Sequence, residues 1–267
     1  MTHRYNRHEP PKLPLSKMLT KVATVPPVAD LRKYCGPVKN QGNEGSCTGH
    51  AFSESFEWIY RAYAGYWLPK GIPPNPLFSP QYFYERELIM DGDFPNDNGS
   101  DGETACNVAT QYGCCRLVLD PYIDGQIIEP TAAQDADARQ FMMGAYHGLT
   151  GSKVALSVLG DPVPWPVQMG FTVYASFESD EVANTGIYNP NTSTESVLGG
   201  HEVMLCGFDL GTTPTLRPAA CPPAALVMNS WGLDWGWEGS GFFWAVLPVL
   251  DDPQADLKVI HSGSSWR

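Results

Sequence analysis

The chain has 267 residues, 43% of them apolar, and a formal net charge of −12. This length suits one globular unit, and the acidic balance argues against nucleic-acid binding, because phosphate groups attract a basic surface. No run of 18 apolar residues is present, and charges and prolines interrupt the N-terminus where a signal peptide has an apolar core. We therefore expect a soluble monomer that binds neither nucleic acid nor membrane, with no visible export signal.

The number of cysteines bears on the compartment. Seven is an odd number, so at least one thiol is free if the others pair within the chain. The seven are Cys35, Cys47, Cys106, Cys114, Cys115, Cys206 and Cys221. This count favours the cytoplasm or another reducing compartment, while one or two disulfides and export by a non-classical route stay open.

The first 40 residues are basic, whereas the rest of the chain is acidic. They carry eight Lys or Arg side chains against two acidic ones, and five prolines interrupt residues 1–29. Prolines disfavour a helix, so residues 1–29 are predicted to form an extended basic N-terminal arm. Its charge is opposite to that of the body, on which it could dock.

Three helices are predicted in the first half of the chain. Apolar residues recur at three-and-four spacing after Ser46, which predicts an amphipathic helix that ends at Gly65. Residues 79–90 and 102–113 fit two more helices, the second ending at Gly113. Residues 122–170 are mixed in character, and no element is predicted there.

Short apolar or alternating runs dominate from residue 169 onward. They lie at residues 171–177, 201–209, 224–231 and 240–246, and Gly, Pro and Asn separate them. Such runs are typical of antiparallel strands. A helical first half and a strand-rich second half predict an α+β fold.

The stretch NQGNEGSC ends on Cys47, at the predicted start of the first helix. Unpaired backbone N–H groups at a helix N-terminus favour a thiolate, so this cysteine is a candidate nucleophile. Gly42 and Gly45 would let a substrate approach the backbone closely, and Gln41 offers an amide donor for an oxyanion. A buried structural cysteine at a helix start is the alternative.

Six histidines compete for the role of the base. His201 follows two glycines and opens a predicted strand in the half that could meet Cys47 across a cleft. His50 lies one helical turn after Cys47, but its place on the apolar face favours core packing. His147 has no supporting context, and the other three lie near the termini, where catalytic geometry is hard to maintain.

A third candidate group lies in the stretch VMNSWGLDWGW. The side-chain oxygen of Asn229 could accept the ring N–H of a histidine and so fix its tautomer, while Trp231 excludes water from that bond. An asparagine in a tight turn over a tryptophan core is the alternative. Cys, His and Asn in this order, with Gln ahead of the Cys, form a stronger signal together than separately.

With these residues in place, the sequence resembles the papain-like cysteine peptidases. The matching blocks are PVKNQGNEGSC, GGHEVMLCGFD and NSWGLDWGWEGSGFF, and Thr48 after the cysteine is similar to bacterial-type members. The resemblance implies a peptidase domain over residues 30–267. It also implies a helical lobe at about 41–125 and an antiparallel β-barrel-like lobe at about 150–267, with the active site in the groove between them.

The resemblance further implies an acyl-enzyme mechanism without metal or cofactor. Its catalytic residues would be Cys47, His201, Asn229 and Gln41, and its substrate would be a peptide or protein. Substrate contacts are expected from Gly45, Gly102, Glu202 and Trp231. The adjacent Cys114 and Cys115 are too compact to make a four-ligand zinc site by themselves.

Three departures from the family pattern change the expectations. Glu44 stands where most members have a disulfide-bonded cysteine, which supports a reducing compartment. Glu202 stands where a small residue commonly lines the main specificity pocket, so it either selects a basic side chain two residues before the scissile bond or is buried and paired. Residues 1–29 replace the family's long propeptide and either restrict the groove or form a plain extension.

Two other classes of function compete with the peptidase. One is a catalytically silent papain-like protein that binds without turnover. The presence of all four mechanistic residues argues against it. The other is a related Cys-His acyltransferase or amidase. The sequence contexts of Gln41 and of the NSWG block favour a peptidase over this alternative.

Overall fold

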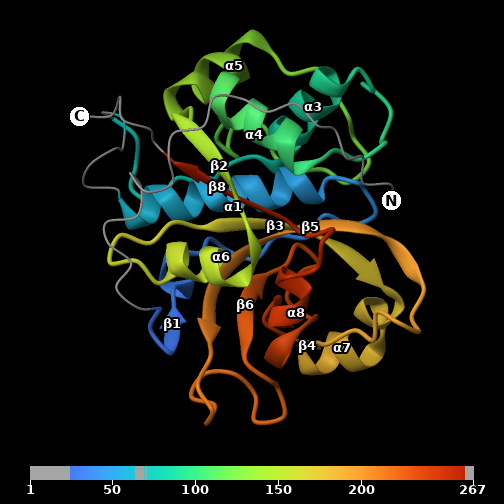
Figure 1. Cartoon of the computed structure of the whole chain (residues 1–267). Coiled ribbons are helices and arrows are strands. Elements are labelled where there is room, and N and C mark those ends of the chain that lie inside the picture. Colours follow the sequence, from blue (N-terminus) through green and yellow to red (C-terminus); the bar gives the residue numbers. More distant parts are fainter. Residues whose placement is uncertain (1–24, 64–68, 70, 262–267) are drawn as a thin grey trace.

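The computed structural model describes residues 25–63, 69 and 71–261 (Figure 1). Its helices are α1 (Cys47–Ala62), α3 (Pro80–Asp91), α4 (Gly102–Gln111), α5 (Ala132–Ala138), α6 (Gly151–Leu159), α7 (Asp180–Thr185) and α8 (Leu247–Leu250). Its strands are β1 (Val28–Asp30), β2 (Ala145–Leu149), β3 (Val167–Tyr174), β4 (Ile187–Tyr188), β5 (Val197–Asp209), β6 (Ala224–Met228), β7 (Phe242–Val246) and β8 (Asp256–His261). Short 3-10 turns lie at Arg32–Tyr34, Arg139–Phe141, Ala175–Glu178 and Trp237–Gly239.

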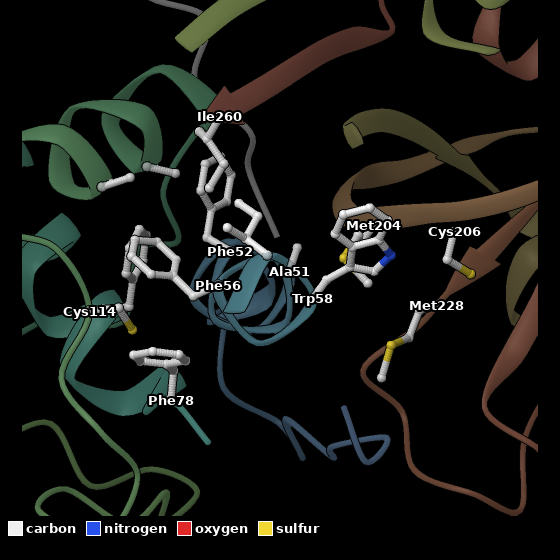
Figure 2. Close-up of a cluster of buried hydrophobic side chains, with 14 of the residues drawn as sticks. Ala51, Phe52, Phe56, Trp58, Phe78, Cys114, Met204, Cys206, Met228 and Ile260 are labelled. Atoms are coloured by element: carbon white, nitrogen blue, oxygen red, sulfur yellow. The ribbon is translucent and has the colours of Figure 1, made fainter. Parts of the chain in front are cut away.

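Helix α1 lies between a group of helices, α3 to α5, and the sheet (Figure 1). Its apolar residues divide between two faces. Phe52 and Phe56, one turn apart, face Phe78 and the helices, whereas Trp58 faces Met204 of the sheet (Figure 2). Because both faces are covered, 14 of its 16 residues are buried. The helix therefore joins the two halves of the molecule and fixes its own N-terminus between them.

The predicted helices of the first half are present, with ends that local chemistry explains. Helix α1 begins directly after Ser46, as predicted, and ends at Ala62 rather than Gly65. The Ser79 hydroxyl caps α3 by accepting the N–H of Tyr82 at 3.0 Å. Gly113 takes a positive φ of 81° just after α4, a conformation that glycine adopts without strain.

The strands form one sheet in the order β2-β8-β3-β5-β6-β7-β4, and β1 pairs with the far end of β5. All pairs are antiparallel except β4 with β7. Every strand predicted from the alternating runs is present. The sheet path ends at β2 and β4 and does not close, so the barrel-like lobe is an open sheet. The predicted α+β organisation is confirmed.

A second buried core lies on the face of the sheet away from α1. It contains Phe171, Phe177 and Phe243, and it packs under α6, α7 and α8. These large rings make the strand-rich half a body with its own apolar interior, which burial of apolar surface stabilises. The sheet is thus covered on both faces and can hold residues at its rim rigidly.

The first part of the chain is described only from residue 25. Residues 1–24 of the predicted arm lie outside the described residues, and Val28 and Ala29 at its end belong to β1. In the described part of the chain, no helix combines the length and apolar character that crossing a membrane requires.

Candidate active site

Cys47 is the first residue of α1 and borders a cavity of about 240 Å³. The loop before it contributes Gly45, residues 97–100 form a second wall, and Gly200 with Glu202 of β5 form a third. The Cys47 side chain keeps 9% of its surface exposed. A helix start, a loop and a strand from distant parts of the sequence therefore meet around one thiol.

A hydrogen bond fixes the ring of His201. Its Nε2 lies 2.8 Å from Oδ1 of Asn229, and the same oxygen accepts the backbone N–H of Ser230 at 2.9 Å. An amide oxygen must face the Ser230 N–H, because the amide nitrogen is itself a donor. His201 therefore donates from Nε2, and in the neutral ring the basic nitrogen is Nδ1.

Backbone pairing brings Gln41 to Asn229 across the two halves of the chain. The Gln41 N–H donates to the Ser230 carbonyl at 2.8 Å, and Asn40 forms an isolated bridge with Trp231. The Ser230 hydroxyl donates to Oε1 of Gln41 at 2.6 Å, which orients the amide. One hydrogen of its Nε2 donates to the Glu44 carbonyl at 2.9 Å. An amide nitrogen has two hydrogens, so the second is left for another acceptor.

The thiol of Cys47 is in an environment that favours its neutral form. Burial raises its pKa to about 12, while the backbone N–H groups of Glu202 and Thr48 act in the opposite direction. The contact with the Glu202 N–H also places the sulfur beside the residue that follows His201. A thiolate at this position requires a nearby positive charge.

Aromatic rings shield the imidazole of His201 from water. The centroid of Trp231 lies 5.2 Å from that of His201, and Phe171 and Phe177 lie at 5.9 and 6.0 Å. His201 itself is 1% exposed. In such a site a hydrogen bond to Asn229 is stronger than it would be in water.

Glu202 is a buried carboxyl group at the wall of the cavity. It is 1% exposed, and neither carboxyl oxygen has a hydrogen-bond partner among the described residues. Gly170 of β3 pairs with Glu202 on one side and with Asp256 of β8 on the other, so no side chain separates the two carboxyl groups. Burial raises the pKa of Glu202 well above its usual value, and Lys258 opposes that shift.

Gly102, an expected substrate contact, is the first residue of α4 and lies against this acidic group. A Cβ on Gly102 would be 3.1 Å from Oδ2 of Asp256 and 3.5 Å from Oε2 of Glu202. The Lys258 ammonium is held by Asp256 at 2.5 and 2.6 Å. The structure thus groups Gly102, Asp256 and Lys258 around Glu202, which lines the cavity, and no motif in the sequence pointed to Asp256 or Lys258.

The other histidines are placed elsewhere. His50 is fully buried, its Nδ1 lies 2.9 Å from the Ser46 carbonyl, and burial lowers its pKa to about 3. His147 stacks on His261 between β2 and β8 at 5.2 Å. Among the described residues, no group of three or more His, Cys, Asp or Glu side chains is arranged to hold a metal ion. All seven cysteines are free thiols.

Two further residues that shape the site, Asp97 and Tyr84, were not predicted from the sequence. Asp97 hydrogen-bonds to the loop before Cys47, and Tyr84 of α3 hydrogen-bonds to Asp97. No local signal marks either residue, since an aspartate in a Gly-rich loop and a tyrosine in a helix are ordinary. The sequence predicts Gly102 as the substrate contact from this region, whereas residues 97–100 just before it form the wall of the cavity.

The chain is similar in sequence to known proteins. No family model matches the chain. An uncharacterised peptidase C1-like protein of Acanthamoeba polyphaga mimivirus is 26% identical over 214 residues, 75% of this chain and 61% of that protein. Cathepsin C of Schistosoma mansoni is 26% identical over 219 residues, 76% of this chain and 43% of that protein. The chain thus spans less than two thirds of the length of either relative.

A solved structure extends the comparison to the fold. Xylellain, a cysteine protease from Xylella fastidiosa, superposes with a TM-score of 0.75 at 23% identity and covers 90% of this chain and 88% of its own. The relatives in sequence and in structure are therefore papain-like cysteine peptidases. The resemblance seen in the sequence is confirmed: the chain is similar in sequence to C1-type peptidases and has the papain-like cysteine peptidase fold.

Proposed function

We propose that the protein is a cysteine peptidase that hydrolyses peptide bonds through an acyl-enzyme on Cys47. The observation that carries the proposal is the hydrogen bond from His201 Nε2 to Asn229, because it makes Nδ1 the basic nitrogen of an imidazole one residue before Glu202, whose backbone N–H contacts the Cys47 sulfur. The similarity to C1-type peptidases supports the same assignment. A peptide or protein is the substrate class that this chemistry implies.

In the first half of the reaction, the Cys47 thiol gives its proton to His201 Nδ1 and the thiolate attacks the peptide carbonyl carbon. The raised pKa of Cys47 means that the thiolate depends on the imidazolium formed in this transfer. The second amide hydrogen of Gln41 and the Cys47 backbone N–H stabilise the oxyanion. The C–N bond then breaks, and His201 protonates the leaving amine.

In the second half, water attacks the thioester carbonyl. His201 Nδ1 takes the proton from this water, and Cys47 leaves as a thiolate that His201 reprotonates. Asn229 accepts the Nε2 hydrogen throughout, so the ring keeps one orientation while its charge changes. No metal or redox step enters this sequence of events.

Peptide hydrolysis by histidine variants tests the proposal. We expect His201→Ala to lower kcat by about 10² to 10⁴, the usual contribution of a general acid and base. His50→Ala is the matched control, since His50 is buried against Ser46 and Tyr122. His50→Ala should keep kcat within a few-fold of the wild-type value and lower the melting temperature. Loss of turnover in His50→Ala with full activity in His201→Ala would reverse the assignment.

We further propose that the wall containing Glu202 prefers a positively charged side chain of the substrate. Glu202 and Asp256 face each other across Gly170, and Asp101 and Glu103 stand at the adjacent start of α4. Lys258 is the one cation in this group of side chains, and Asp256 already binds it. An incoming guanidinium or ammonium group would favour the ionised form of the buried Glu202 carboxyl and give it the partner that it lacks in hydrogen bonding.

The basic arm is proposed to restrict the same cleft. The described chain begins at residue 25, three residues before β1, whose pairing with β5 lies six residues from His201, about 20 Å along a strand. An extended chain of 24 residues reaches up to about 80 Å, so its length permits contact with the cleft. The acidic charge around Glu202 favours such contact electrostatically.

A further inference from the structure

Two of the three walls of the cavity beside Cys47, the loop with Gly45 and residues 97–100, are joined by hydrogen bonds. The carboxylate of Asp97 accepts the N–H of Gly45 with both oxygens, at 3.0 and 3.1 Å. Gly45 stands two residues before Cys47, and both it and Asp97 line the cavity. A single side chain thus connects the loop before the nucleophile to the opposite wall.

Tyr84 extends this connection into the helical core. It is fully buried on α3, and its hydroxyl donates to Oδ1 of Asp97 at 2.5 Å. The same hydroxyl accepts the N–H of Gly99 at 3.0 Å. We call the four residues Gly45, Tyr84, Asp97 and Gly99 the Asp97 clasp. Both walls are therefore fixed to one rigid helix.

The close approach at Gly45 shows how tightly the Asp97 clasp is built. A Cβ at residue 45 would lie 2.8 Å from Oδ1 of Asp97 and 3.3 Å from the Gly99 Cα. Any larger residue would push the walls apart. The glycine is thus required by the contact itself and not by a left-handed backbone.

Nothing covalent holds this loop. Glu44 occupies the position at which the family resemblance implies a disulfide-bonded cysteine, and its carboxylate binds the N–H of Gly125 instead. Asp124 binds the N–H of Asn43 from the outer side. Carboxylates therefore hold the loop before Cys47: Asp97 and Asp124 accept its backbone N–H groups, and Asp97 is the one of these two that lines the cavity.

We propose that Asp97 is a positioning residue for the peptidase, which holds the loop before Cys47 at the distance from residues 97–100 that a bound peptide requires. The inference rests on the proposed function. Asp97 would act through geometry, because the loop that it holds carries both proposed oxyanion donors. These donors are the side chain of Gln41 and, at the end of the loop, the backbone N–H of Cys47. A shift of this loop separates the donors from the nucleophile and lowers kcat.

The test compares peptide turnover with the reactivity of the thiol. Asp97→Ala removes the acceptor and should lower kcat by about tenfold, the usual effect of losing one charge-assisted hydrogen bond that positions reacting groups. Alkylation of Cys47 by iodoacetamide needs no oxyanion donor and should stay within twofold of the wild-type rate. Asp97→Asn keeps an oxygen toward Gly45 and Tyr84 and should restore part of kcat.

Two further variants separate positioning from a general loss of structure. Tyr84→Phe removes one oxygen atom and should lower kcat about threefold, and the double variant with Asp97→Ala should be no worse than Asp97→Ala alone. Asp93→Ala is the control, because it removes a charge from the same loop outside the cavity. It should leave kcat unchanged.

The outcomes distinguish this inference from the proposed function. If the wild-type protein hydrolyses no peptide, the proposed function fails. If the wild type is active and Asp97→Ala keeps kcat within twofold, as Asp93→Ala does, the positioning role is wrong. Strictly additive losses for Tyr84→Phe and Asp97→Ala would also overturn it, because the two side chains would then act separately. Should Asp97→Ala not fold, Tyr84→Phe alone decides. A kcat that is lowered about threefold supports the positioning role, and an unchanged kcat contradicts it.

Discussion

At the scale of single residues, the site is organised by which atom donates each hydrogen. Asn229 receives two N–H groups on one oxygen, and this alone assigns the proton on His201. The order Cys, His, Asn in the sequence predicted these partners. It could not predict Asp256 or Asp97, because strand register brings Asp256 to Glu202 and loop packing brings Asp97 to the cavity.

The carboxyl group of Glu202 leads to a prediction about substrate charge. Two peptides that differ only in Arg or Leu at the second residue before the scissile bond should differ in kcat/KM by about tenfold in favour of Arg, equal to about 1.4 kcal/mol. Glu202→Gln removes the charge at constant size and should bring the ratio close to one. Equal turnover of the two peptides by the wild type would show that Glu202 is a buried structural carboxyl.

At the scale of elements, α1 combines a structural and a chemical role. Its presence and its start were predictable because its apolar residues recur at helical spacing after Ser46, whereas its end lies at Ala62 rather than Gly65. The elements missed, such as β2, α6 and β8, have shorter patterns: β2 contains a glycine and a histidine, and β8 contains a lysine. These strands form because β2 pairs with β8 and β8 pairs with β3, which is information that local spacing does not contain.

Helix α1 also buries Glu54, which makes stability depend on pH. Burial raises the pKa of Glu54 to about 8 in the folded protein, above its usual value of 4.5. Between these values the folded state keeps a proton that the unfolded state has lost, so the free energy of unfolding falls as pH rises. His50, whose pKa is lowered to about 3, has the opposite effect, but only below its usual value of 6.5.

The window from about pH 6.5 to 8 therefore isolates the buried carboxyl groups. Urea unfolding should give a free energy that decreases with pH there, by up to about 1.4 kcal/mol per pH unit for each such group. Glu54→Gln should flatten the slope, while Glu129→Gln, at an exposed position, should not. A slope that is unchanged in Glu54→Gln would mean that Glu54 ionises alike in both states.

At the scale of the whole molecule, α1 packs between the helical half and the sheet and contacts both. The Gln168 amide of β3 donates to the Ser55 hydroxyl of α1, and segment 39–41 pairs with 230–232 near the cavity. The α+β class and the strands of the second half of the chain were predictable from the sequence. The open path of the sheet was not, because it depends on the order in which the strands pair.

The basic arm is tested at this scale. Deleting residues 1–24 should raise the rate of peptide hydrolysis several-fold if the arm covers the acidic cleft. High salt should produce a similar rise in the full chain, because it screens the attraction between the arm and the cleft. Equal rates for the full and shortened chains at low salt would make the arm a plain extension.

The most direct test of the account is covalent labelling of Cys47 with an epoxide inhibitor of cysteine peptidases, followed by mass spectrometry of the peptides. We predict one adduct, on Cys47, that is lost in Cys47→Ala, strongly slowed in His201→Ala and unchanged in Cys35→Ala, which removes a partly exposed thiol. Labelling of Cys35 as fast as Cys47, or an unchanged rate in His201→Ala, would contradict an activated nucleophile at Cys47.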